Sequence, residues 1–225
     1  MANHVGTLLD EEQQLAARRI ALMGAASGEI VGGGGAVVLA IIALAGILPT
    51  TLLAGAGLAV GAALMFEGGA IASRYRDIAA ELDSRFDLTA LGGGLSAEFL
   101  GGAAGVVLAL ITLLGLNTAM LMAISAIVYG GALVIGAETA AELRSLTVPR
   151  SEKHEHLQKI AHSALSATVS TRVMGGLGAV VLGILALIDA PSSVTLSLVA
   201  FLAIGGTILL SGTAIGGKVL AIFRH

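Results

Sequence analysis

The chain has 225 residues, of which 56% are hydrophobic and only 12% are charged, with 32 glycines, a formal net charge of −3 and no cysteine. A soluble chain carries about a quarter of its residues as charged side chains, so this composition leaves too little polar surface to cover a globule. The small net charge argues against a nucleic-acid partner, and the lack of cysteine excludes disulfides and thiolate metal sites. We therefore expect an integral membrane protein whose main partner is the lipid bilayer.

Three long windows of the chain contain almost no charged side chains. Residues 30–66 and 99–137 contain no Asp, Glu, Lys or Arg, and residues 173–217 contain only Asp189. Because about 20 helical residues cross a bilayer, each window is long enough for two spans. Polar residues or proline mark a turn inside each window. The sequence predicts an all-α six-helix membrane bundle, with spans at 30–48, 51–72, 98–116, 119–140, 172–189 and 193–217.

The polar stretches between these windows predict the domain order. We expect an amphipathic N-terminal segment (1–29), hairpin 1 (30–72), an amphipathic connector helix (73–97), hairpin 2 (98–140), a second connector helix (141–171), hairpin 3 (172–217) and a tail (218–225). All twelve Lys and Arg residues lie outside the three hairpin turns. The positive-inside rule therefore predicts that both termini and both connectors are cytoplasmic.

A short motif occurs three times, at spacings of 69 and 74 residues. It consists of a serine, a charged residue two positions later and a Gly-Gly pair that begins three positions after the charge. Its copies are Ser27, Glu29, Gly32 and Gly33; Ser96, Glu98, Gly101 and Gly102; and Ser170, Arg172, Gly175 and Gly176. The repeat predicts three parallel hairpins related by an axis along the membrane normal.

Each position of the motif has a structural interpretation. A serine that precedes an apolar helix is typical of an N-cap, which we prefer to a ligand role. The paired glycines predict close packing of helix backbones. For the charged residues, two hypotheses stay open. In one, Arg172 compensates Glu29 and Glu98 in a buried cluster; in the other, all three side chains lie separately at the level of the lipid headgroups.

Two further carboxylates lie near the inner ends of the second and fourth predicted spans. Glu67 precedes Arg74 by seven residues, or about 10 Å along a helix, so it is expected inside the apolar zone if Arg74 lies at the interface. Glu138 holds a similar position before Arg144. We interpret both as candidates for handling protons or cations, for sensing cytoplasmic acidification, or for pairing with a partner helix.

The sequence contains no recognisable arrangement of catalytic or cofactor-binding residues. All five histidines lie in the polar segments, and no nucleophile triad, catalytic carboxylate pair or dinucleotide motif is found. His154 and His156 would point to different faces of a helix, which favours a solvated polar helix over a metal site. We expect no enzymatic activity, no metal and no cofactor.

The hairpin pattern resembles the HdeD family of bacterial inner-membrane proteins. Each hairpin contains an apolar run after a glycine, a turn with proline or polar residues, and a second apolar run with a Gly-Gly pair; the matching stretches begin at Gly35, Gly105 and Gly178. The resemblance implies a six-helix protein of the bacterial inner membrane that is associated with acid resistance. It supplies no active-site residues.

We therefore expect a non-enzymatic inner-membrane protein that acts through interaction with the membrane or with other proteins, in acid or envelope stress. The small-residue helix faces favour a homo-oligomer or a membrane-protein partner. Two alternatives stay open. One is a small proton, ion or solute channel or transporter, and the other is an accessory subunit that anchors a larger membrane complex.

Overall fold

The described part of the chain is a bundle of six helices. The computed structural model describes residues 27–81, 88–147 and 155–222, with side chains over 27–69, 97–137, 169–189 and 191–213. The first described helix is Ser27–Leu44. It is followed by α2 (Pro49–Glu81), α3 (Leu88–Leu113), α4 (Thr118–Thr147), α5 (Glu155–Ile188), the short 3-10 helix η2 (Ala190–Ser192) and α6 (Ser193–Ile222).

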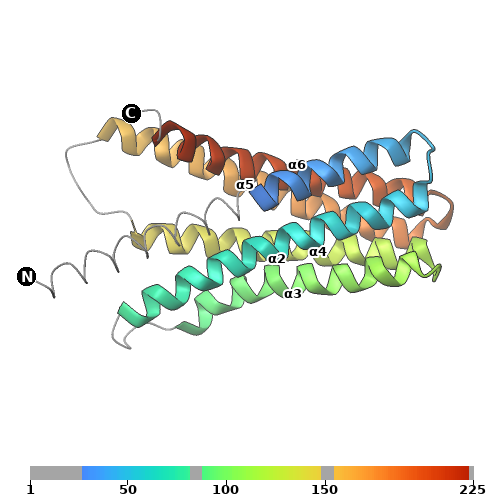
Figure 1. Cartoon of the computed structure of the whole chain (residues 1–225), viewed down its shortest axis with the longest axis horizontal. Helices are drawn as coiled ribbons and strands as arrows, with labels where there is room; N and C mark the ends of the chain where they lie inside the picture. Colours follow the sequence, from blue (N-terminus) through green and yellow to red (C-terminus); the bar gives the residue numbers. More distant parts are fainter. Residues whose placement is uncertain (1–26, 82–87, 148–154, 223–225) are drawn as a thin grey trace, which may run out of the picture.

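Three turns connect consecutive helices at one end of the bundle, which we call the turn end (Figure 1, right). Gly46 and Gly115 end the first helix and α3 with positive φ angles of 91° and 84°, a conformation that glycine adopts without a steric penalty. The third turn is η2, where the Ser192 amide donates a hydrogen bond to the Asp189 carbonyl at 3.2 Å. The second and third turns lie where the sequence predicts them. The first lies a few residues earlier than predicted, because α2 already begins at Pro49.

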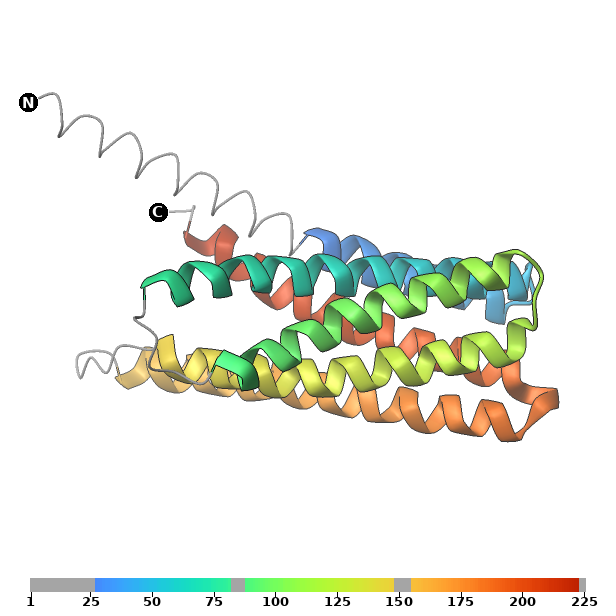
Figure 2. The ribbon, with the colours of Figure 1, turned by 90° about the horizontal axis from the view of Figure 1, so that it is seen from below.

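Helices α2, α4 and α6 form the inside of the bundle, since each of them contacts the other two. Half of the apolar window is buried in α4 and in α6, and 44% in α2, but only 28% in the first helix and in α5. The exposed faces of these two outer helices carry large apolar side chains such as Val31 and Met174. Figure 2 shows all six helices running along the long axis of the bundle. Such a surface suits lipid as its surrounding medium.

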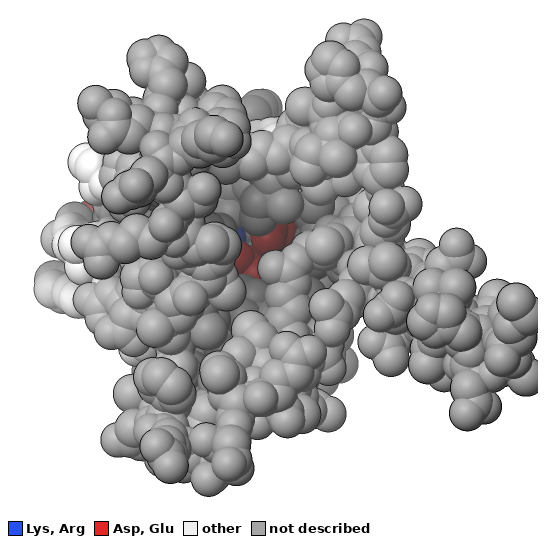
Figure 3. Space-filling model, turned by 90° about the vertical axis from the view of Figure 1, so that its left-hand side faces the viewer, with Lys and Arg blue, Asp and Glu red and all other residues white. Residues whose placement is uncertain are grey.

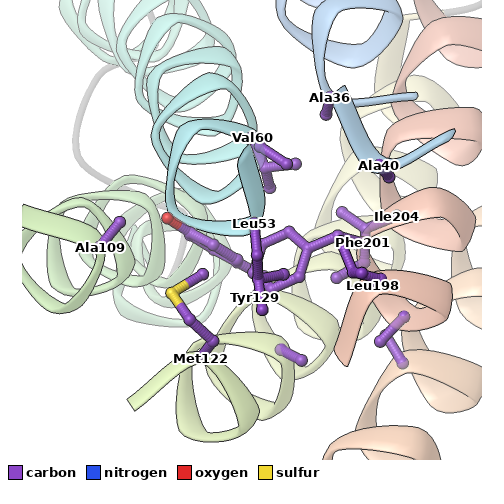
Figure 4. Packing of buried hydrophobic residues seen from close by; sticks show 14 of the residues in the cluster. Ala36, Ala40, Leu53, Val60, Ala109, Met122, Tyr129, Leu198, Phe201 and Ile204 are labelled. Atoms are coloured by element: carbon purple, nitrogen blue, oxygen red, sulfur yellow. The ribbon is translucent and has the colours of Figure 1, made fainter. Parts of the chain in front are cut away.

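Large apolar side chains fill the space between the three inner helices (Figure 4). Tyr129 of α4 and Phe201 of α6 pack edge to face, with ring centroids 5.8 Å apart. The Tyr129 hydroxyl donates a hydrogen bond to the Gly57 carbonyl of α2 at 2.8 Å, so the buried polar atom has a partner. We call this region the apolar core; it also contains Leu53, Val60, Met122, Leu198 and Ile204, all at most 2% exposed.

Five of the six helices are long and apolar enough to cross a membrane. They are Ser27–Leu44, Pro49–Gly69, Thr118–Ala137, Val169–Ile188 and Ser193–Thr213. The remaining expected span, 98–116, falls on α3, whose described apolar stretch Ala97–Leu113 is shorter. The lengths and the apolar surface are those of a multi-pass membrane protein.

The expected connectors at 73–97 and 141–171 are not separate helices within the described ranges. Instead α2 continues to Glu81, α4 continues to Thr147, and α5 begins at Glu155. A helix satisfies its own backbone hydrogen bonds in lipid and in water alike, so a change from apolar to polar sequence does not end it. The limits of the hydropathy windows are therefore not the limits of the helices.

The prediction of helix caps is wrong for two of the three motif serines. Ser96 lies within α3 and Ser170 lies within α5, so the backbone around them is already helical. Ser27 is the first described helical residue and is exposed. The remainder of the expected N-terminal segment, residues 1–26, lies outside the described residues, as do residues 223–225 of the tail.

Candidate functional site: a buried arginine among three carboxylates

Arg172 of α5 lies inside the bundle, toward the end opposite the turns, and is 5% exposed. Charged and polar side chains from four other helices surround it. We call the group the Arg172 cluster; it consists of Arg172, Glu29 of the first helix, Glu67 of α2, Glu98 of α3 and Ser211 of α6. All five residues are at most 5% exposed. Acidic and basic atoms are visible from this end at the centre of the molecule (Figure 3).

The guanidinium of Arg172 contacts all three carboxylates. Its Nη1 donates a hydrogen bond to Glu98 Oε1 at 3.3 Å. Its Nη2 forms an ion pair with Glu67 Oε1 and lies 3.7 Å from Glu29 Oε2. Several donors in a planar fork allow one arginine to serve several acceptors, which the single ammonium of lysine does less well. Arg172 therefore links α5 to three other helices.

Ser211 adds a second layer of contacts to the Arg172 cluster. Its Oγ accepts hydrogen bonds from Arg172 Nε at 3.1 Å and from Arg172 Nη2 at 2.5 Å. The same hydroxyl donates to Glu29 Oε2 at 3.1 Å. The serine thus bridges the arginine and one carboxylate, and it brings α6 into the cluster.

Two glycines make room for the carboxylates. A β-carbon at Gly136 of α4 would overlap Glu98 Oε1, and one at Gly212 of α6 would lie 2.9 Å from the Glu29 β-carbon. A side chain at either position would therefore displace a glutamate from the cluster. These glycines were not predicted as site residues.

One oxygen in the cluster has no hydrogen-bond partner among the described residues. It is Oε2 of Glu67, whose other oxygen pairs with Arg172. A buried carboxylate oxygen without a donor is costly, because nothing replaces the water it has lost. The ion pair with Arg172 therefore provides a partner for only one of the two carboxylate oxygens of Glu67.

The structure brings together the three charged residues of the repeated motif. Glu29, Glu98 and Arg172 lie in one buried cluster and not separately at the level of the headgroups. Glu67 lies in the same cluster. From the sequence, we expected it to be a candidate for handling protons or cations separately from the three motif residues. The side chain of Glu138, which belongs to α4, lies outside the described residues.

Sequence reasoning missed Ser211, although its spacing carries a signal. Glu67 follows Glu29 by 38 residues, and Gly136 follows Glu98 by 38 residues. Ser211 follows Arg172 by 39 residues. Glu67, Gly136 and Ser211 therefore hold corresponding places in the three predicted hairpins. All three lie at the cluster, so applying the motif spacing to the second helices would have pointed to them.

The paired glycines of the motif make close helix contacts of two kinds. The β-carbon position of the first glycine meets the helix that follows in the sequence; the pairs are Gly32 with Ala63, Gly101 with Ala132, and Gly175 with Thr207. The second glycine meets another inner helix; the pairs are Gly33 with Leu209, Gly102 with Gly61, and Gly176 with Gly130. A side chain at any of these six positions would push helices apart.

The described residues contain no group of three or more His, Cys, Asp or Glu side chains arranged to hold a metal ion. The arrangement is instead that of a buried ion-pair network, in which one cation serves several anions. No family model matches the chain, and no curated protein or solved structure matches it. The structural observations that bear on function are therefore the Arg172 cluster and the packing around it.

Proposed function

We propose that this chain is a non-enzymatic, multi-pass protein of the bacterial inner membrane that acts through contacts with lipid and with membrane proteins, in acid or envelope stress. The stress role follows the resemblance to the HdeD family. Both termini are proposed to face the cytoplasm, because all twelve Lys and Arg residues lie outside the hairpin turns. The Arg172 cluster then lies toward the cytoplasmic side.

The apolar core is the observation that carries this proposal. Between the cluster and the turn end, the inner helices are packed with Tyr129, Phe201, Leu198 and Ile204, all at most 2% exposed. A channel or transporter needs polar groups or water along a path through the whole bilayer. Among the described side chains, the buried charged groups gather at one end of the bundle. The core beyond them is mainly apolar, and its buried polar groups include the hydroxyls of Ser125 and Ser197. This packing favours an interaction role over transport.

We further propose that the bundle consists of three parallel copies of one hairpin. The two kinds of glycine contact follow the same rule in each copy, which supports this arrangement. The meeting of Glu29, Glu98 and Arg172, which hold the same motif position, supports it as well. Parallel copies around an axis along the membrane normal place equivalent residues at one depth, where three helices can bring them into contact.

The stress role is tested by deleting the gene in its host and measuring survival after an acid challenge. We expect reduced survival, restored by the wild-type chain and not by an Arg172→Leu variant produced at a similar level. Survival equal to that of the parent strain under both acid and envelope stress would contradict the role.

Transport is tested separately, by reconstituting the purified chain into liposomes with an imposed proton or cation gradient. We expect the gradient to decay at the rate of empty liposomes, because the apolar core blocks the path. Decay that is faster and that depends on Glu67 would favour the channel alternative. Purification from native membranes in one stable assembly with a larger complex would favour the anchoring alternative.

A further inference from the structure

We infer that the Arg172 cluster selects which helical hairpins pair in the membrane, because it accepts one arginine-bearing hairpin in each group of three. The hairpins are those of the proposed repeat: the first helix with α2 (hairpin 1), α3 with α4 (hairpin 2), and α5 with α6 (hairpin 3). The competing partner is a hairpin from a second copy of this chain. The inference rests on the proposed hairpin repeat and not on the proposed role in acid stress.

The three interfaces between hairpins share one glycine contact. In each interface, a β-carbon on a glycine of an inner helix would lie close to the carbonyl oxygen of a glycine on the outer helix of another hairpin. The pairs are Gly61 and Gly102 at 2.9 Å, Gly130 and Gly176 at 2.5 Å, and Gly205 and Gly33 at 3.0 Å. A contact that all three interfaces share allows helices to approach closely, but it does not distinguish one hairpin from another.

These contacts run in one direction around the bundle and close after three hairpins. The inner helix α2 meets α3, α4 meets α5, and α6 meets the first helix. Each hairpin therefore presents two different faces, as a subunit of a cyclic assembly does. The chain links hairpin 1 to hairpin 2 and hairpin 2 to hairpin 3, but it does not link hairpin 3 to hairpin 1. Hairpin 1 of a second copy therefore offers α6 the same glycine contact.

The Arg172 cluster, in contrast, receives different residues from each hairpin. Arg172 of hairpin 3 contacts Glu98 of hairpin 2 through Nη1. Through Nη2 it contacts Glu67 and Glu29, which both belong to hairpin 1. One hairpin of the three therefore supplies the guanidinium that the carboxylates of the other two contact.

Groups with a different number of arginines fit the cluster poorly. A group without hairpin 3 would leave the buried carboxylates without the guanidinium that they contact here. A group with two copies of hairpin 3 would place two guanidinium groups at the same depth. Unpaired buried charges and neighbouring like charges are the means by which interfaces reject wrong partners. The glycines thus bring hairpins together, and the cluster decides between them.

Two full-length variants test this selection when they are produced in one cell with different affinity tags. Arg172→Glu supplies no arginine to the cluster, and Glu98→Arg supplies two. Neither chain alone provides one arginine for each group, but exchange of hairpin 3 between the two chains gives two groups with one arginine each. We therefore expect the two variants to purify together in equal amounts. Their complex should unfold at a higher temperature than either variant produced alone.

Two controls separate selection from general stability. The double variant Glu98→Arg/Arg172→Glu has one arginine in one chain, so it should unfold near the wild-type temperature. Its tagged copies should purify together no more than two wild-type copies do. Gly130→Ala weakens an interface between hairpins without changing a charge, so it should lower the unfolding temperature without increasing the exchange between tagged copies.

Separate aggregation of the two single variants in the shared cell would overturn the inference, because complementary partners would then have failed to pair. It would also be overturned if Gly130→Ala copies exchanged as readily as the charge variants, or if the double variant unfolded as early as the single variants. All these outcomes concern purified chains. Unchanged acid survival without the protein would contradict the proposed function and leave the inference intact.

Discussion

The two halves of the bundle are held together in different ways. At the Arg172 cluster, one side chain contacts residues of four other helices through charge and directed hydrogen bonds. In the apolar core, Tyr129 makes one hydrogen bond and one ring contact, and the remaining contacts are spread over many apolar side chains. In lipid, apolar burial does not distinguish the inside of a bundle from its outside. The cluster and the glycine contacts therefore specify the arrangement, and the apolar core fills it.

The largest effect should follow from Arg172→Leu. The substitution leaves three buried carboxylates without their cation, and removing one partner of a buried ion pair costs about 3–5 kcal/mol. We expect a lower unfolding temperature and aggregation on size-exclusion chromatography. Arg172→Lys keeps the positive charge, so its unfolding temperature should fall less than that of Arg172→Leu. Unchanged stability of Arg172→Leu would contradict the importance of the cluster.

A smaller loss is expected for Ser211→Ala, which removes the hydroxyl between Arg172 and Glu29. Hydrogen bonds to charged groups contribute about 1.5–3 kcal/mol. The measurement is thermal unfolding at equal detergent and lipid content. Ser170→Ala serves as the control, because Ser170 is exposed on α5. If both variants lose the same stability, the bridge has no special role.

Adjacent glycines of α4 allow a matched test of close packing. A β-carbon at Gly130 would lie 2.5 Å from the Gly176 carbonyl oxygen, whereas one at Gly131 would have no neighbour within 4 Å. Gly130→Ala should cost about 1–3 kcal/mol through overpacking. Gly131→Ala should be neutral or stabilising by up to about 1 kcal/mol, since alanine favours the helix. Equal behaviour of the two variants would contradict the contact between α4 and α5.

The smallest effect should come from the apolar core. Tyr129→Phe removes the hydrogen bond to the Gly57 carbonyl and keeps the aromatic ring against Phe201. We expect a loss of about 0.5–1.5 kcal/mol in the free energy of unfolding. If Tyr129→Phe lowered the free energy of unfolding as much as Arg172→Leu does, the two halves of the bundle would not differ in how they are held together.

Much of the fold and part of the site are predictable from the sequence. Hydropathy places the helices and their turns, and the spacing of the motif places Glu29, Glu98 and Arg172 at one level. The rotation of each helix about its own axis is harder to predict, because nearly all faces of these helices are apolar and no polar side marks the outside. Whether Glu67 points to Arg172 or to lipid depends on that rotation. The same limit applies to Ser211, which is one of several small polar residues on α6 and is distinguished from the others only by the repeat spacing.

The contact between the first helix and α6 joins segments that are far apart in the chain. Gly33 meets the backbone of α6 at Gly205 and Leu209, and Gly212 meets Glu29. The helix that opens the described chain and the helix that closes it are therefore neighbours, at the end opposite the turns. A circularly permuted chain, with α6 linked to the first helix and new termini between α2 and α3, would retain every helix contact described above.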